Sequence, residues 1–226
     1  MSNNLKRDAA LVALGEVRDG MTLGLGTGST AEEFVKLLGA AVSRGELRDL
    51  RCTCTSTMTE ALARHLKLAT FPLDDLFPLD LTVDGADEID EQLRLIKGRG
   101  GALLREKIVE QASRRFIVIA DDSKLVGRLG VGALPVEVTP FARETVMRAL
   151  STQGLQPKVR LQENREFVTD ERHLIYDVTL SGERDIAEVV NDIRALAGVV
   201  ETGFFPREAT EAVVAGAGGV KRWQRS

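Results

Sequence analysis

A lysine, a glycine-rich turn and a glutamate lie close together in the segment IKGRGGALLREK, residues 96–107. Its four cations surround one carboxylate, Glu106, near the start of a predicted helix. Such a glutamate can accept a proton, and the helix dipole together with Lys97 favours its ionised form. The segment is therefore either a solvated surface or a site where a carboxylate moves a proton beside an anionic substrate.

The predicted helix carries an apolar stripe formed by Leu104, Ile108 and Ala112. At ~100° per residue, Glu106 lies about 200° around the helix from Leu104 and from Ile108, so we expect it to face away from that stripe. Its charged neighbours are expected to be solvated: Arg105 and Lys107.

A group of carboxylates follows the predicted strand LTVD, where VDGADEID sets Asp84, Asp87 and Glu88 close together. Ligands bind at such strand ends in parallel sheets, and clustered carboxylates need cations or hydrogen bonds to coexist. The group is either a surface acidic turn or a pair of anchors for sugar hydroxyls, with Lys97 as compensating cation. A magnesium site is disfavoured, because such sites usually serve nucleotide phosphates and the sequence has no nucleotide loop.

The loop LGLGTGSTAEEF after the first predicted strand is rich in glycine and hydroxyl groups. Its spacing fits two capping boxes, Ser29 with Glu32 and Thr30 with Glu33. Alternatively, its glycines let backbone N–H groups approach a ligand oxygen at a helix N-terminus. A dinucleotide fingerprint is disfavoured, because Gly24-x-Gly26-x-x-Ser29 lacks the third glycine.

The segment TSTMTEAL repeats this spacing with Thr57 and Glu60, and there we expect capping alone.

Short apolar strands alternate with amphipathic helices through the first half of the chain. MTLGL, RCTCTS, LTVD and FIVIA are the predicted strands, and LLREKIVEQASRR is the helix before the last of them. This alternation predicts an α/β fold, a Rossmann-like, largely parallel sheet covered by helices.

The pattern changes from Leu134, where the predicted elements follow the order βαββαβ. These elements are LPVEV, FARETVMRALSTQ, PKVRL, HLIYDVTL, DIAEVVNDIRAL and VVETGFF. This order predicts a ferredoxin-like α+β second domain over residues 131–205. The strand-like EAVVAG after Pro206 is expected to return to the first sheet. The Rossmann-like catalytic domain would then be discontinuous, residues 1–130 and 206–226.

Composition excludes several classes of partner. A formal net charge of -4 with scattered basic residues argues against a nucleic-acid surface. No run approaches the ~18 apolar residues of a membrane span. Asp8, Glu16 and Asp19 interrupt the N-terminal apolar run, so we expect an amphipathic first helix and not a signal peptide, and a cytoplasmic protein.

The spacing of the cysteine and histidine residues predicts neither a metal site nor an activated nucleophile. Cys52 and Cys54 are the wrong distance apart for a zinc knuckle, and we expect both to be packing residues. His65 and His173 are expected to be isolated.

The chain contains four motifs in order: GTGST, DGADE, KGRGGALLREK, and DDSK followed by LPVEV. With these motifs it resembles type A ribose-5-phosphate isomerase essentially end to end. That resemblance implies interconversion of D-ribose 5-phosphate and D-ribulose 5-phosphate in the pentose phosphate pathway, without a metal or organic cofactor. It also suggests a homodimer or homotetramer.

Carried over by motif, the resemblance makes Glu106 the base that moves a proton between C2 and C1 through an enediolate. Lys97 and Asp84 would hold the reacting oxygens, and Asp84 would assist ring opening. The expected substrate-binding residues are Thr27, Gly28, Ser29, Thr30, Asp84, Gly85, Ala86, Asp87, Lys97, Gly98, Arg99, Gly100 and Lys124. Whether the Arg99 guanidinium or only its backbone N–H meets the substrate is open.

Two rival functions are a non-catalytic sugar-phosphate sensor and a nicotinamide-dependent oxidoreductase. The retained Glu106 argues against the sensor, because binding alone requires no base. The incomplete glycine pattern argues against the oxidoreductase.

Overall fold

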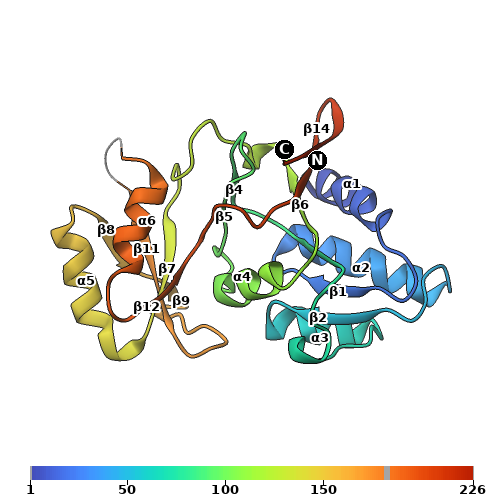
Figure 1. The fold of residues 1–226 in the computed structure, drawn as a ribbon, viewed down its shortest axis with the longest axis horizontal. Coiled ribbons are helices and arrows are strands. Elements are labelled where there is room, and N and C mark those ends of the chain that lie inside the picture. The colour runs from blue at the N-terminus through green and yellow to red at the C-terminus, as the bar shows by residue number, and fades with distance from the viewer. Residues whose placement is uncertain (1, 181–183, 226) are drawn as a thin grey trace. The chain divides into compact units, whose positions relative to one another are not determined.

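The computed structural model describes residues 2–180 and 184–225. The chain forms two compact units (Figure 1). Unit 1 comprises Met1–Ala86, Arg105–Leu125 and Arg207–Ser226, and unit 2 comprises Asp87–Leu104 and Val126–Pro206. The expected domain bounds stay a prediction, and the units differ from them in residues 87–104, residues 126–130 and Pro206, which group with unit 2.

Unit 1 is built on a six-stranded sheet with the order β15-β14-β6-β3-β1-β2. Its strands are β1 (Thr22–Leu25), β2 (Arg51–Cys54), β3 (Leu81–Asp84), β6 (Phe116–Asp121), β14 (Glu211–Gly216) and β15 (Gly219–Gln224). The pairs β2–β1, β1–β3, β3–β6 and β6–β14 are parallel. The expected α/β class and the return of EAVVAG to the first sheet are confirmed.

Helices α1 (Ser2–Leu14), α2 (Ser29–Ser43), α3 (Thr57–His65) and α4 (Leu103–Gln111) accompany this sheet. The core between helices and strands contains Ala9 and Ala13 of α1, Phe34 and Leu38 of α2, and Leu25 of β1, all fully buried. Burial of this apolar surface, at ~25 cal/mol per Å², is the main force that holds α1 and α2 on the sheet.

The hairpin that β14 makes with β15 was not expected from the sequence. The two strands pair antiparallel from Glu211↔Gln224 to Gly216↔Gly219. Gly219 has a φ of 98°, a left-handed conformation that glycine adopts without strain. The polar sequence GVKRWQ thus forms an edge strand and not a tail.

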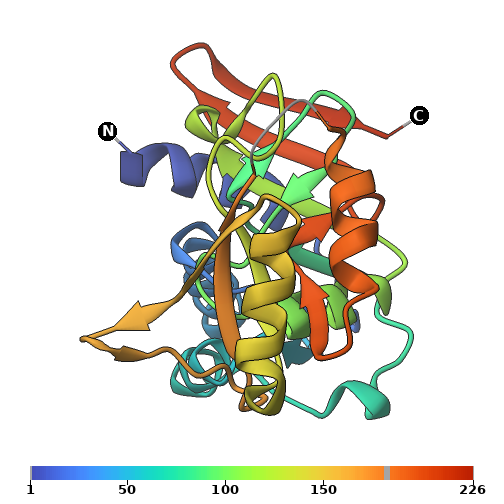
Figure 2. The same ribbon diagram turned by 90° about the vertical axis from the view of Figure 1, so that its left-hand side faces the viewer.

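Unit 2 contains a four-stranded antiparallel sheet with the order β12-β7-β11-β8. Its elements are β7 (Leu134–Val138), α5 (Arg143–Thr152), β8 (Gln156–Val159), β11 (Leu174–Thr179), α6 (Ile186–Arg194) and β12 (Val199–Thr202). Both helices lie on one face of the sheet (Figure 2), over a core that includes Val136, Val138, Val146, Tyr176 and Ile193. The predicted βαββαβ order is confirmed.

Smaller strands complete unit 2. β4 (Glu88–Ile89), β5 (Leu95–Ile96) and β13 (Phe204–Phe205) form a three-stranded antiparallel sheet in the order β13-β5-β4. A hairpin of β9 (Leu161–Gln162) and β10 (Arg165–Glu166) follows β8.

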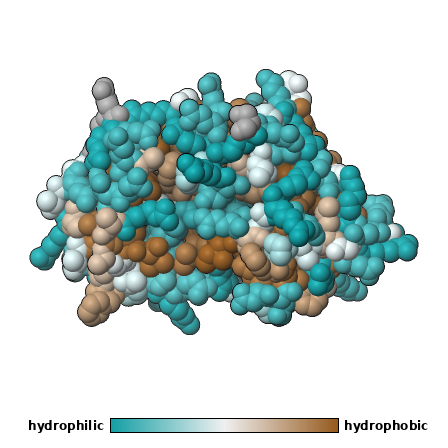
Figure 3. Space-filling view, in the orientation of Figure 1, coloured by the Kyte–Doolittle hydropathy of each residue, from teal (hydrophilic) through white to brown (hydrophobic). Residues whose placement is uncertain are grey.

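Hydrophilic residues cover most of the face shown in Figure 3. Within the part of the chain that the structure describes, no helix is long and apolar enough to cross a membrane.

A buried carboxylate, Glu137, lies on β7 between two core valines and is 1% exposed. Its Oε1 accepts hydrogen bonds from the Thr169 hydroxyl at 2.9 Å and makes a 3.0 Å contact with His173 Nδ1. His173 is therefore not isolated, contrary to expectation, because strand pairing brings it to a residue far away in sequence. Burial raises the pKa of Glu137, although its bonds to His173 and Thr169 lower it.

This raised pKa predicts a pH-dependent contribution to stability. Above the usual value of 4.5, the folded protein retains a proton on Glu137 that the unfolded chain has lost, so this contribution disappears as pH rises through the folded-state pKa. We expect the free energy of unfolding of the wild type, relative to Glu137→Gln, to fall as pH rises above 4.5. Denaturant unfolding over a pH series measures it, and a difference that is flat or rises with pH contradicts it.

Candidate active site

Three neighbouring parallel strands of unit 1 bring expected site residues to one edge of the sheet. Leu25 of β1 is in register with Val83 of β3, and Asp84 of β3 is in register with Val118 of β6. The loops after these strands hold residues 26–30, residues 85–86 and the short 3-10 helix Asp122–Lys124. An ideal Cβ on Gly85 would lie 3.9 Å from Thr30 Cβ, so the first two loops are in contact.

Asp84 joins the loops after β1 and β3. Its side chain is fully buried, and Oδ1 accepts backbone N–H bonds from Thr27 at 3.0 Å and Gly85 at 2.6 Å. Gly26 permits this approach, because a Cβ there would lie 2.1 Å from the same oxygen. The close packing fixes the direction of the Asp84 carboxylate.

The start of α2 has no side-chain cap. Its N-cap is Gly28, with a φ of 107° and no side-chain capping hydrogen bond. Ser29 Oγ instead accepts a hydrogen bond from Lys6 Nζ at 2.8 Å. The capping-box interpretation of this loop is therefore wrong, and the alternative of a helix N-terminus whose N–H groups meet a ligand stays open.

A cluster of hydroxyl groups lies beneath the same loop. Thr27 Oγ1 is 2.6 Å from Thr55 Oγ1 and donates to Ser56 Oγ at 2.8 Å. Ser56 is the N-cap of α3 and accepts from the Thr59 N–H. The expected capping box of Thr57 with Glu60 is therefore wrong, because the N-cap is one residue earlier, at Ser56. Glu60 pairs with Arg64 instead.

Helix α4 buries a polar face. Glu106 is 5% exposed, Lys107 4% and Glu110 2%, whereas Ile108 is 46% exposed. The expected apolar stripe and the expected solvation of Lys107 are therefore wrong. An ionisable residue is rarely buried without interactions that compensate the lost hydration, so this face marks α4 as a candidate for function.

In unit 2, Lys97 follows β5 and is only 2% exposed. Its backbone N–H donates to Gly203 O at 2.9 Å, and its Nζ lies 5.6 Å from the centroid of the Phe205 ring. Gly203 is required at this point, because a Cβ there would lie 2.1 Å from Lys97 O.

Arg99 is held at both its backbone and its guanidinium. Its N–H donates to Asp87 Oδ2 at 2.9 Å, and Nη2 lies 3.1 Å from Glu88 Oε1. Glu88 is 2% exposed and also accepts from the N–H groups of Gly130 and Gly132, at 2.7 and 2.6 Å. The sequence singled out Glu88 only as a member of the acidic group and gave no sign that it anchors Arg99.

Expected site residues thus fall in both units. Thr27, Gly28, Ser29, Thr30, Asp84, Gly85, Ala86, Glu106 and Lys124 belong to unit 1, whereas Asp87, Lys97, Gly98, Arg99 and Gly100 belong to unit 2.

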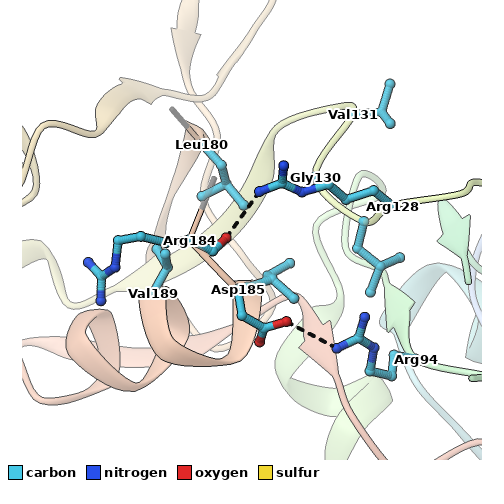
Figure 4. A pocket seen from close by; sticks show the side chains of 10 residues that line it. Arg94, Arg128, Gly130, Val131, Leu180, Arg184, Asp185 and Val189 are labelled. Atoms are coloured by element: carbon cyan, nitrogen blue, oxygen red, sulfur yellow. Dashed lines mark hydrogen bonds and ion pairs between the residues drawn. The ribbon is translucent and has the colours of Figure 1, made fainter. Parts of the chain in front are cut away.

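A hollow of about 500 Å³ in unit 2 is lined by other residues (Figure 4). Figure 4 shows Arg94 and Asp185 joined, and Arg128 donating to the carbonyl of Arg184. Arg94 also pairs with Asp90, and Arg184 pairs with Asp192, each at 2.6 Å. Because carboxylates pair with Arg94 and Arg184, and Arg128 is bonded to a carbonyl, we assign this hollow no ligand.

The two cysteines are packing residues, as expected. Cys52 belongs to the core of unit 1, and Cys54 packs against it. Burial raises the pKa of each thiol to about 12, which disfavours the reactive thiolate.

Polar groups at the carboxyl edge of a parallel sheet, with helix N-termini around them, place this chain in the class of α/β proteins that bind small molecules at strand ends. Residues 51–219 match the model of the family described as ribose 5-phosphate isomerase A (phosphoriboisomerase A). The chain belongs to this family.

Similar proteins agree over the full length. The ribose-5-phosphate isomerase A of Rhodopseudomonas palustris (strain HaA2) is 47% identical over 99% of this chain and 98% of its own. A solved D-ribose-5-phosphate isomerase in complex with phospho-erythronic acid is 36% identical, with a TM-score of 0.95 and 100% of both chains covered. Ribose 5-phosphate isomerase from Plasmodium falciparum is also 36% identical, with a TM-score of 0.95 over 99% of both chains.

The contact between Gly26 and Asp84 gives a prediction about stability. We expect Gly26→Ala to lower the free energy of unfolding by about 1–3 kcal/mol, because its methyl group overlaps the buried carboxylate. Chemical denaturation measures the loss. The control is Gly218→Ala in the same unit, where a Cβ meets nothing within 4 Å. Equal stability of the two variants contradicts the steric argument.

Proposed function

We propose that this protein interconverts D-ribose 5-phosphate and D-ribulose 5-phosphate by proton transfer between C2 and C1. The observation that carries the proposal is the buried Glu106 in the first turn of α4, in a chain of the ribose 5-phosphate isomerase A family. A relative of the same fold is described in complex with phospho-erythronic acid, a four-carbon phosphorylated acid. A sugar phosphate is therefore the proposed substrate.

In the proposed mechanism, Glu106 is the general base. It removes the proton from C2 of the open-chain aldose, which leaves an enediolate, and then returns that proton to C1, while the hydroxyl proton on O2 passes to O1 and the C2 carbonyl of the ketose forms. Burial supports this role, because water cannot compete for the carboxylate or the transferred proton.

Lys97 and Asp84 are proposed to hold the oxygens on C1 and C2. A fixed ammonium in a site with little water stabilises negative charge that develops on these oxygens. Lys97 fits this role because it is buried and its backbone is held by Gly203. Asp84 is also proposed to assist ring opening, and its bonds to Thr27 and Gly85 keep one carboxylate oxygen in place.

The remaining proposed substrate contacts are backbone and side-chain donors. The uncapped N-terminus of α2, with Gly28, Ser29 and Thr30, offers N–H groups to an anion. Thr27, whose N–H is bonded to Asp84, would lie beside them. The sugar would be lined by Gly85, Ala86, Asp87, Gly98, Arg99 and Gly100. Lys124 would add positive charge. The Arg99 guanidinium already lies against Glu88, which favours a contact through the backbone of the turn.

The reaction moves a proton and no hydride, so the proposed mechanism uses neither a redox cofactor nor a metal. A non-catalytic sugar-phosphate sensor is the alternative, and the assay that separates them is conversion of ribose 5-phosphate to ribulose 5-phosphate in chelator, without added cofactor. Turnover supports the isomerase, whereas binding without turnover supports the sensor.

We also propose a cytoplasmic homodimer or homotetramer. The support for this is the resemblance to the family alone.

Glu106→Gln tests the base. We expect turnover to fall by ~10² to 10⁴, the usual effect of losing a general base, while the circular dichroism spectrum stays unchanged. The matched control is Glu110→Gln, one turn further along α4 and equally buried, which should retain turnover. Near-normal turnover by Glu106→Gln contradicts the assignment.

Lys97→Ala tests the electrophile. Because the ammonium is proposed to stabilise the enediolate, we expect kcat to fall by at least ~10²-fold, as for loss of an oxyanion-hole donor. Steady-state kinetics with ribose 5-phosphate measures it. A change in KM with unchanged kcat means that Lys97 only binds substrate.

A further inference from the structure

The turn Gly98–Gly101 is held by a residue far away in sequence, Arg160, which follows β8. Arg160 Nη1 donates to the carbonyl oxygens of Gly98 and Arg99, at 2.7 and 3.0 Å. These bonds lie within unit 2. A charged donor to a backbone carbonyl is stronger than a neutral one, so the contact orders the turn strongly.

Arg160 is itself fixed in place. Its Nε donates to Asp177 Oδ2 at 2.9 Å, and Nη2 pairs with the other carboxylate oxygen. The Arg160 side chain is 12% exposed, and its backbone N–H donates to Ile175 O at 2.8 Å. The guanidinium therefore joins the four-stranded sheet to the turn.

The two accepting carbonyls determine which way the peptide N–H groups point. In a planar trans peptide the C=O and the next N–H point in opposite directions. The carbonyl of Gly98 faces Arg160, and the Arg99 N–H donates to Asp87 at 2.9 Å. By the same geometry, the bond to the Arg99 carbonyl turns the N–H of the exposed Gly100 away from Arg160.

The turn has the backbone freedom that makes such a clamp necessary. Gly98 and Gly101 have φ values of 103° and 85°, and glycine carries the largest conformational entropy of any residue. A Cβ on Gly101 would lie 2.3 Å from Phe167 Cζ, in the segment after the β9–β10 hairpin. The Phe167 N–H donates to Arg160 O at 2.9 Å, so the same residue also orients that segment.

We propose that Arg160 is a positioning residue, which orders the turn Gly98–Gly101 for binding of the sugar phosphate. This inference rests on the proposed function. Without the guanidinium, only a fraction of molecules would hold the turn in its binding conformation, and apparent affinity falls by that fraction. Saturating substrate restores the ordered turn, so KM changes and kcat does not.

Arg160→Ala is the principal test. We expect KM for ribose 5-phosphate to rise ~10-fold or more, with kcat within about 3-fold of wild type. The matched control is Arg184→Ala, which removes another guanidinium–carboxylate pair of unit 2, with Asp192 of α6. It should leave KM unchanged. A lower melting temperature of Arg160→Ala with unchanged KM, or a lower kcat with unchanged KM, overturns the proposal.

Two milder variants keep the test decisive if Arg160→Ala does not fold. Arg160→Lys keeps a cation but loses the fork that reaches both Asp177 and the turn, so KM should lie between those of wild type and Arg160→Ala. Asp177→Asn loosens Arg160 without removing it and should raise KM less. An unchanged KM in both variants overturns the proposal.

Hydrogen exchange separates this inference from the proposed function. Amides of residues 96–104 should exchange faster in Arg160→Ala, or in Arg160→Lys, than in wild type and Arg184→Ala, without any ligand. If wild type does not convert ribose 5-phosphate, the proposed function fails. If wild type is active and the exchange of these amides is unaffected, the role of Arg160 fails.

Discussion

The buried carboxylate of Asp84 is the constraint on which the candidate site depends. One oxygen accepts N–H bonds from the loops after two neighbouring strands, and the side chain is fully removed from water. A charge in this place is tolerated only if its partners are fixed, because an unpaired buried carboxylate is very costly. Three features hold the partners of Asp84 in place. They are the absence of a side chain at Gly26, the register of β1 with β3, and the course of the loop through Thr27.

The second unit follows the same logic with different residues. Glu88 receives two backbone N–H groups and a guanidinium, and Arg160 gives its donors to Asp177 and to two backbone carbonyls. Each side chain joins segments that are distant in sequence. Polar networks of this kind fix one geometry where hydrophobic packing alone would allow several.

Much of the fold could be predicted, because strand and helix periodicities are written in local sequence. The order βαββαβ and the return of residues 211–216 to the first sheet both followed from such patterns. The buried face of α4 could not be predicted in this way, because the rule that apolar residues lie inside fails for this helix. Its buried face carries the charged residues Glu106 and Glu110. Strand β15 was missed because its polar sequence, GVKRWQ, resembles a tail. The roles of Glu88, Arg160 and His173 depend on contacts that no local pattern encodes.

The β14–β15 hairpin also bears on how the sheet of unit 1 avoids edge-to-edge pairing with strands of other chains. A parallel sheet that ended at β14 would present a row of unpaired backbone groups on an almost entirely buried, apolar strand. β15 pairs with that row and is itself mostly exposed, with Lys221 and Arg222 on it. At the opposite edge, the Cys52 N–H donates to Ala69 O and the Phe71 N–H to Cys52 O, so a passing segment covers β2. A passing segment therefore covers one margin of the sheet and a charged, exposed strand forms the other, which disfavours the edge-to-edge pairing that leads to aggregation.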